Sequence, residues 1–146
     1  MRKALAALLL LFASGTGTLS AAAEPPERGE LLVHATGFAN ARGHAVAKLF
    51  VAGDKVLESG RWQLVAPIEA DGAAFRFGGL PAGRYAVVVF HDVNDNLAID
   101  HGWFGPSEPL GFSGGFALSW VSGRPDFERL QFDFKPPLQT LEVRVR

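Results

Sequence analysis

The sequence of 146 residues contains no cysteine, and this absence excludes several classes of protein. The chain forms no disulfide, carries no lipid-modified N-terminal cysteine and offers no thiolate ligand to zinc. A domain of about 120 residues can bury enough apolar surface to fold without such crosslinks. We therefore expect one domain that is stabilised by its core alone.

Apolar runs long enough to span a bilayer are also missing. The longest, residues 4–13, has ten residues, whereas a transmembrane helix needs about 20. It follows Arg2 and Lys3 and precedes a small-residue tract that ends in three alanines at residues 21–23. This arrangement predicts a signal peptide over residues 1–23, cleaved before Glu24, and a mature domain over residues 24–146. The mature chain is then periplasmic or secreted, with no transmembrane segment.

Basic clusters are absent from the predicted mature chain. Removing Arg2 and Lys3 from the 14 basic residues leaves 12 against 15 acidic residues, a net charge of −3. Proteins that bind nucleic acid usually present a basic face, so nucleic acid is not expected as a partner. An exported domain instead leaves envelope or extracellular molecules as the class of partner.

Alternating apolar residues predict an all-β fold: a single antiparallel β-sandwich of about seven strands with one long loop. The second strand is apolar on both faces except for Lys48, which indicates a central position, and Pro67 places the third strand on an edge. Residues 84–91 form the most buried strand, and a short helical turn is expected near residues 125–130. The predicted strands are residues 30–36, 44–51, 61–66, 73–77, 84–91, 128–134 and 139–145.

The predicted long loop, residues 101–125, is rich in glycine and aromatic residues. Loops of this length are uncommon in compact domains and are often functional. One interpretation is that the aromatic side chains fold the loop back over the end of the sandwich, and we favour it. The other is that they form a binding surface for a peptide, a polymer or a small ligand, which exposure of the two tryptophans would support. The aromatic residues are Trp103, Phe104, Phe112, Phe116 and Trp120.

Acid and amide side chains follow the most buried strand at a spacing typical of a cation-binding loop. Asp92, Asn94, Asn96 and Asp100 match positions 1, 3, 5 and 9 of the calcium loop of EF-hand proteins. Calcium prefers six to eight oxygen ligands, and alternate side chains of a tight loop can turn toward one point. The spacing therefore indicates a calcium-type site at the rim of the sandwich.

The match to that loop is partial. Leu97 stands at the sixth position in place of glycine, and Trp103 stands at the twelfth in place of a bidentate glutamate. Ala98 would offer its backbone carbonyl at the seventh position, and Asp95 or Glu108 could supply a missing carboxylate. The alternative is a polar turn in which Asp92 and Asn94 accept hydrogen bonds from their own backbone. If a cation binds, we expect its role to be structural.

His91 lies beside Asp92, and a histidine–aspartate pair can indicate zinc binding or acid–base chemistry. A tetrahedral zinc site needs three or four ligands, so we favour His91 as a strand-end residue that caps the loop by hydrogen bonding. An enzyme would need His91 to converge with Asp92 or Asp100 on one pocket. We assign no catalytic residue.

Residues 111–115 satisfy the pattern G-x-S-x-G, with Ser113 at its centre. The pattern marks a nucleophile only between a strand and a helix of an α/β-hydrolase, and this chain is too short and too rich in β-structure for that fold. We therefore set the hydrolase interpretation aside. The residues proposed to contact a ligand or to form a lid over the rim site are His91, Trp103, Phe104, Glu108, Phe112 and Ser113.

Several of these segments together resemble an uncharacterised family of exported bacterial proteins, domain of unknown function 2141. The resemblance covers almost the whole mature chain, although the family usually has glycine where this chain has Leu97, and a residue between Gly105 and Pro106. It implies a transthyretin-like or immunoglobulin-like sandwich, exported to the periplasm or beyond, and it implies no known activity. The matching segments are residues 85–87, 91–100, 105–108, 111–113 and 125–128.

Overall fold

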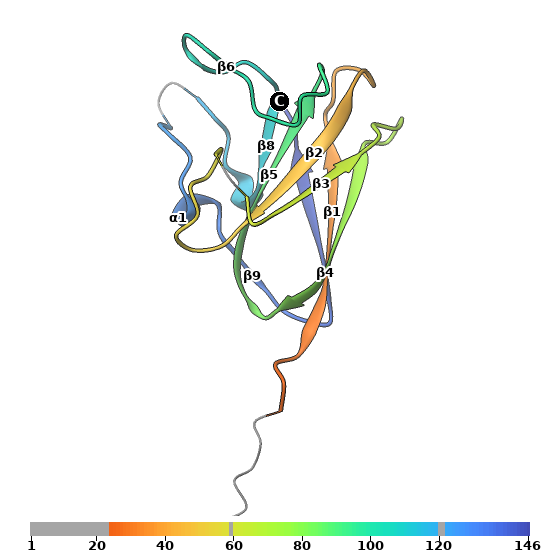
Figure 1. The fold of residues 1–146 in the computed structure, drawn as a ribbon, viewed down its shortest axis with the longest axis vertical. Coiled ribbons are helices and arrows are strands. Elements are labelled where there is room, and N and C mark those ends of the chain that lie inside the picture. The colour runs from red at the N-terminus through yellow and green to blue at the C-terminus, as the bar shows by residue number, and fades with distance from the viewer. Residues whose placement is uncertain (1–23, 59, 120–121) are drawn as a thin grey trace, which may run out of the picture.

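The computed structural model describes residues 24–58, 60–119 and 122–146 (Figure 1). The predicted signal peptide and Trp120 lie outside these residues. Two sheets form the body of the protein, and the all-β prediction is confirmed. One sheet has the order β10-β1-β4, built from Leu138–Arg144, Arg28–Thr36 and Ala73–Pro81. The other has the order β3-β2-β5-β8, built from Trp62–Ala66, His44–Phe50, Gly83–Asp92 and Leu110–Phe112, and β9 (Phe132–Phe134) also pairs with β5.

Strand positions follow the apolar pattern closely. β2 lies between β3 and β5, as its apolar faces predict, and β3 is an edge strand that ends before Pro67. One prediction was wrong in detail: the sheets are not purely antiparallel, because β1 and β10 pair in parallel, with Val33 opposite Leu141. Strand direction depends on how the chain returns to the sheet, which an alternating pattern in a single strand does not encode.

The main core lies between the two sheets. Its buried side chains alternate along each strand, as they do for Leu31, Val33 and Ala35 of β1 and for Phe75 and Phe77 of β4. Burying a side chain of this size contributes about 1.5–3 kcal/mol. The core therefore supplies the stability that disulfides supply in smaller exported domains.

A second apolar cluster covers the outer face of β2 and β5. The side chains of Val46, Phe90 and Leu130 belong to it, and so does Leu57 from the connection between β2 and β3. Because this layer covers the face that a two-sheet sandwich would leave in water, residues 85–92 of β5 are all buried. The prediction that this strand is the most buried one is confirmed, and β5 is fixed from both sides up to Asp92.

The region predicted as one long loop is more regular than expected. It contains the hairpin formed by β6 (His101–Gly102) and β7 (Gly105–Pro106), then β8 and the 3₁₀ helix η1 (Ser113–Gly115). Strand β8 pairs with β5 on one side, and Leu110 exchanges backbone hydrogen bonds of 3.1 and 3.2 Å with Arg146 on the other. These bonds join the two sheets along one edge. These pairings join residues far apart in the sequence, so the glycine-rich local composition gives no sign of them.

A four-residue helix, α1 (Phe127–Leu130), replaces the first half of the predicted strand over residues 128–134. The Asp126 side chain accepts a hydrogen bond of 3.0 Å from the backbone N–H of Arg129, which caps the helix at its N-terminus. The helical turn expected near residues 125–130 is therefore confirmed. Leu130 is fully buried in the outer cluster, whereas Phe134 of β9 reaches the main core.

Helices long and apolar enough to cross a membrane do not occur within residues 24–58, 60–119 and 122–146.

Candidate functional site

The rim site begins where β5 ends, at Asp92. This carboxylate is fully buried, and its two oxygens accept the backbone N–H groups of Asn96 at 3.1 Å and Leu97 at 2.8 Å. The chain between them turns tightly, with left-handed backbone angles at Asp95 (φ 57°) and Leu97 (φ 61°). Asp92 thus organises the loop that follows it by occupying donors that would otherwise lack partners.

Asp100 closes the loop against the two asparagine side chains. The Asn94 amide donates to one carboxylate oxygen of Asp100 at 2.7 Å, and the Asn96 amide donates to the other at 2.8 Å. The carbonyl oxygens of the same amides accept backbone N–H groups within the loop, from Asn96 at 3.2 Å and from Ala98 at 2.9 Å. All four residues predicted for the site are therefore brought together, in the hydrogen-bonding pattern of a polar turn.

Glu108 reaches the same place from the segment after the β6–β7 hairpin. Its carboxylate accepts the backbone N–H of Asp100 at 3.3 Å. Burial raises the pKa of Glu108, and the charges of Asp100 and Asp92 raise it further, while the N–H groups of Asp100 and Val93 act in the opposite direction. Of the two residues that the sequence left open as a further carboxylate, Glu108 lies beside Asp100 and Asp95 does not.

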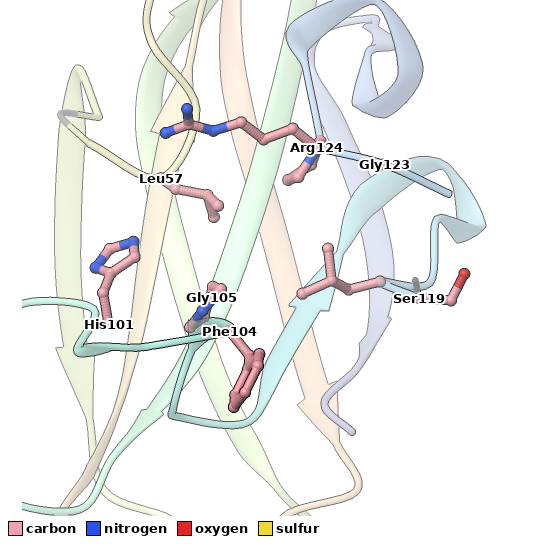
Figure 2. A pocket seen from close by; sticks show the side chains of 10 residues that line it. Leu57, His101, Phe104, Gly105, Ser119, Gly123 and Arg124 are labelled. Atoms are coloured by element: carbon pink, nitrogen blue, oxygen red, sulfur yellow. The ribbon is translucent and has the colours of Figure 1, made fainter. Parts of the chain in front are cut away.

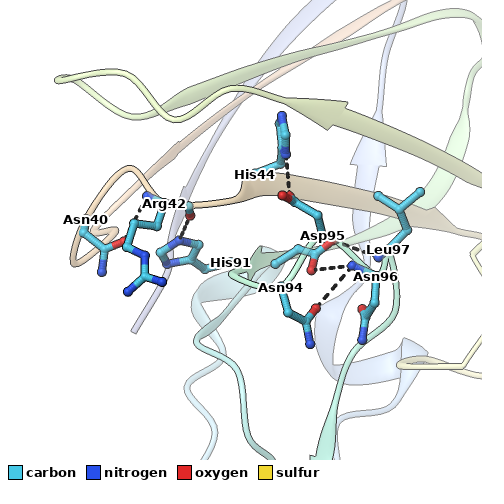
Figure 3. Close-up of polar contacts among 9 residues, drawn as sticks. Asn40, Arg42, His44, His91, Asn94, Asp95, Asn96 and Leu97 are labelled. Atoms are coloured by element: carbon cyan, nitrogen blue, oxygen red, sulfur yellow. Dashed lines mark hydrogen bonds and ion pairs between the residues drawn. The ribbon is translucent and has the colours of Figure 1, made fainter.

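Asp95 turns away from Asp100 and toward strand β2. Its Oδ1 lies 2.5 Å from Nδ1 of His44, and both side chains are about half exposed (Figure 3). Because His44 lies opposite Asp92 in the pairing of β2 with β5, this contact fastens the loop to the neighbouring strand. No sequence motif links His44 to the loop, and only the register of the two strands brings it there.

His91 and Asp92 lie on opposite faces of β5, as neighbouring residues of a strand do. The His91 ring is buried, its Nε2 donates to the backbone carbonyl of Arg42 at 2.7 Å, and its edge packs against Phe38 at 5.6 Å between ring centroids. Figure 3 shows this ring directed away from Asn94 and Asn96. His91 therefore caps the loop before β2 instead of the loop after β5, and it forms no acid–base pair with Asp92 or Asp100.

Gly43 is a further residue of the site that the sequence does not single out. A Cβ at this position would lie 2.0 Å from the backbone oxygen of Asp92, and the residue has a φ of +67°. Any larger residue would therefore push the loop before β2 off the end of β5. A glycine in a turn gives no local sign of such a contact, because the contact depends on tertiary structure.

Two aromatic residues of the 101–125 region contradict the packed-loop interpretation. Trp103 and Phe104 form the tip of the β6–β7 hairpin, and their side chains are 100% and 87% exposed. Trp103 therefore does not form a lid over Asp92. Phe112 is buried and meets the half-buried Phe116 edge to face, with centroids 5.3 Å apart, as packing predicts.

Ser113 is buried and serves the backbone. Its hydroxyl donates to the carbonyl of Leu130 at 2.6 Å and accepts the N–H of Val87 at 2.9 Å. A hydroxyl held in this way, with no histidine among its hydrogen-bond partners, is not an activated nucleophile. The G-x-S-x-G pattern here joins β5, η1 and α1.

A ready-made metal centre of three or more histidine, aspartate or glutamate side chains is not found in the part of the chain that the structure describes. Two further oxygens of the rim site belong to the side chains of Asn94 and Asn96, and amide oxygens also serve as calcium ligands. The geometry shows a polar loop with two clustered carboxyl groups, Asp100 and Glu108, beside buried Asp92.

Comparison with known families identifies the chain. The model of the family described as "Uncharacterized protein conserved in bacteria (DUF2141)" matches residues 33–142. The protein belongs to this family. In this DUF2141 protein the match runs from β1 into β10, so it includes both sheets and the whole rim site. No curated protein and no solved structure matches the chain, so the likeness to transthyretin or immunoglobulin folds stays a prediction.

Proposed function

We propose that this DUF2141 protein is an exported, non-enzymatic module whose rim site binds a calcium-type cation through Asp92, Asn94, Asn96, Asp100 and Glu108. The family is bacterial, so export would bring the chain to the periplasm or outside the cell. Export itself rests on the charged start, apolar run and small-residue end of residues 1–23. The cation would have a structural role at the end of β5.

One observation carries this proposal: the carboxylates of Asp92, Asp100 and Glu108 gather without a counter-charge. None of the three forms an ion pair within the described ranges. Burial raises the pKa of Glu108, and the charges of the other two raise it further. Like charges in a partly buried site repel one another unless protons or a cation neutralise them. A divalent cation would remove this repulsion.

The asparagine side chains support the proposal because their two ends are interchangeable. An amide carries a carbonyl oxygen on one side and an NH₂ group on the other. In the geometry described, the NH₂ groups of Asn94 and Asn96 face Asp100 at 2.7 and 2.8 Å. Rotating both amides would turn their oxygens toward the position from which a cation could contact Asp100. The rotation would break the bonds that these oxygens accept from the N–H groups of Asn96 and Ala98, so the bound cation has to compensate for that loss. The cation would then hold the base of the hairpin to β5.

Calcium titration of the metal-stripped protein tests the proposal. We expect a binding heat in calorimetry and a rise in melting temperature, because a ligand at 100 times its Kd stabilises the native state by about 2.7 kcal/mol. Asp100→Asn and Glu108→Gln should each weaken binding. Asp95→Asn is the matched control, because Asp95 faces His44 and not Asp100. The absence of both a binding heat and a thermal shift at millimolar calcium would refute the proposal. Equal losses of calcium binding in all three variants would also refute it.

A second function is favoured by the exposure of Trp103. Trp103 is fully exposed at the tip of the hairpin, and the phenylalanine that follows it is largely exposed. Aromatic residues, tryptophan above all, are enriched among the residues that contribute most to binding. We infer a binding surface here for an envelope or extracellular partner: a peptide, a polymer or a small ligand. This function does not compete with the first, because the rim site holds the base of the hairpin that presents Trp103.

Fluorescence can test the second function. In a variant with Trp62→Phe and Trp120→Phe, emission reports only Trp103, and acrylamide should quench it strongly in the free protein. We expect a peptidoglycan fragment, an oligosaccharide or a peptide from a soluble panel to protect it from quenching. Trp103→Ser in the otherwise unmodified protein should lose binding of the same ligand. If no member of the panel protects Trp103, this second function is refuted.

A further inference from the structure

A groove lies beside the β6–β7 hairpin and is separate from the rim site. Its volume is about 490 Å³, within the range of about 300–1,000 Å³ that small-molecule sites occupy. Three segments form its walls: the connection after β2, the hairpin itself and the chain before α1 (Figure 2). Its apolar lining includes the side chains of Leu57, Phe104, Pro106 and Leu118.

The apolar wall of the groove combines one buried leucine with a strained backbone and two apolar side chains that are exposed to water. Leu57 is 6% exposed and has a left-handed backbone, with φ of 74°, which costs a leucine about 1–2 kcal/mol. Leu118 is 42% exposed and Phe104 is 87% exposed, although both line the groove. Covering these two side chains would remove apolar area from water, which favours a ligand with an apolar body.

The basic side chains of the groove favour an acidic head group. Arg124 and His101 line it, and none of the described lining residues is acidic. In the view of Figure 2 Leu57 lies between the Arg124 guanidinium and the His101 ring. Arg124 makes one ion pair, with Glu58 at 3.9 Å, and both side chains are largely exposed. An exposed pair at this distance is weak, so a bound carboxylate could replace Glu58.

We propose that the groove binds a small amphipathic carboxylic acid. Its hydrocarbon chain lies against Leu57, Phe104 and Leu118, and its carboxylate faces Arg124, whose planar guanidinium suits two parallel hydrogen bonds. This inference rests on the second proposed function, the binding surface of the hairpin, and names a ligand class and a site for it.

Three ligands with the same eight-carbon chain test the proposal by calorimetry with the purified protein: octanoate, octanol and octylamine. We expect octanoate to bind with one site per chain, octanol to bind about tenfold more weakly and octylamine more weakly still. A tenfold difference corresponds to about 1.4 kcal/mol, a moderate value for one partly exposed charged contact. Equal binding of octanoate and octanol would overturn the proposal, and so would no binding of octanoate.

Variants locate the binding. Arg124→Gln should lower the affinity for octanoate about tenfold and leave that for octanol unchanged, whereas Leu118→Asn should weaken both ligands. Glu58→Gln should strengthen octanoate binding by removing the competing carboxylate. The matched control is Arg76→Gln, since Arg76 is also an exposed, ion-paired arginine but lies on β4, outside the groove. If Arg76→Gln weakens octanoate as much as Arg124→Gln does, the groove is not the site.

Failure of this inference is distinguishable from failure of the proposed function. If a polymer or peptide protects Trp103 from acrylamide while octanoate does not bind, the groove proposal is refuted and the binding function of the hairpin stands. If nothing protects Trp103 and octanoate does not bind, the groove proposal and the binding function of the hairpin are both refuted. Binding of octanoate that Arg124→Gln weakens and Arg76→Gln does not would support the groove proposal, whereas the function at Trp103 is judged by the quenching experiment alone.

Discussion

Leu97 offers the sharpest test of how the rim loop is held. Its backbone is left-handed, with φ of 61°, while its N–H donates to buried Asp92 at 2.8 Å. Residues with a Cβ lose about 1–2 kcal/mol in this conformation, and glycine loses almost nothing. The loop therefore keeps a strained leucine where an EF-hand loop has glycine.

The informative comparison is between Leu97→Gly and Leu97→Ala. The leucine side chain is 46% exposed, so both variants lose some packing, and that loss cancels in the difference between them. Glycine removes about 1–2 kcal/mol of strain from the folded state. It also lowers the stability by about 0.5–1 kcal/mol, because the unfolded chain gains conformational freedom. We expect Leu97→Gly to exceed Leu97→Ala by about 0.5–1 kcal/mol in the free energy of unfolding.

Urea unfolding followed by circular dichroism measures this difference, provided that both variants give the same dependence on urea. Ala98→Gly is the control, because Ala98 is not among the residues with positive φ. Glycine there should destabilise the protein by about 0.5–1 kcal/mol. A Leu97→Gly variant that is no more stable than Leu97→Ala would show that the left-handed turn is not adopted in solution, and would refute the loop geometry on which the rim site depends.

Substitutions at three buried polar residues can be compared by urea unfolding. Ser113→Ala should cost about 1–3 kcal/mol, because the N–H of Val87 loses its buried acceptor; no loss would contradict this bond. Asp92→Ala should cost more than Asp92→Asn, since an amide oxygen can still accept one of the two N–H groups that Asp92 holds, from Asn96 and Leu97; equal costs would contradict that role. Burial lowers the pKa of Lys48 below 10.5, so between the lowered value and 10.5 the unfolded chain binds more protons and the stability of the wild type rises with pH. Lys48→Met should lack this rise, so the free energy of unfolding of the variant minus that of the wild type should decrease as pH increases through that window. Parallel pH profiles of the two proteins would contradict the burial of Lys48.

Much of the fold could be predicted because it follows from local alternation. The strands β1, β4 and β10, which are buried mainly on one face, show the period of two that such burial demands, from Leu31 in β1 to Val143 in β10. The continuous apolar run of β5 likewise indicates burial on both faces. What covers its outer face, including Leu57 and Leu130, could not be predicted, because that layer is irregular chain and one helical turn.

The residues of the rim site could be predicted as a set because they lie close together in sequence. Asp92, Asn94, Asn96 and Asp100 fall at a spacing that a tight loop brings to one point, and their hydrogen bonds to one another confirm that they meet. Glu108 was one of two candidates for a further carboxylate, and spacing alone did not separate it from Asp95. The hairpin that returns Glu108 to Asp100 made that choice.

The sequence by itself determined the all-β class, the buried strand before Asp92 and the polar loop after it, because apolar period and turn chemistry act over a few residues. Tertiary structure alone decided which way each side chain of the loop faces. The register between β2 and β5 brings His44 to Asp95, and the close approach of Gly43 fixes the end of β5. Tertiary structure also decided that Trp103, at the tip of the β6–β7 hairpin, is exposed. Contacts of this kind join residues far apart in the chain, and no local pattern records them.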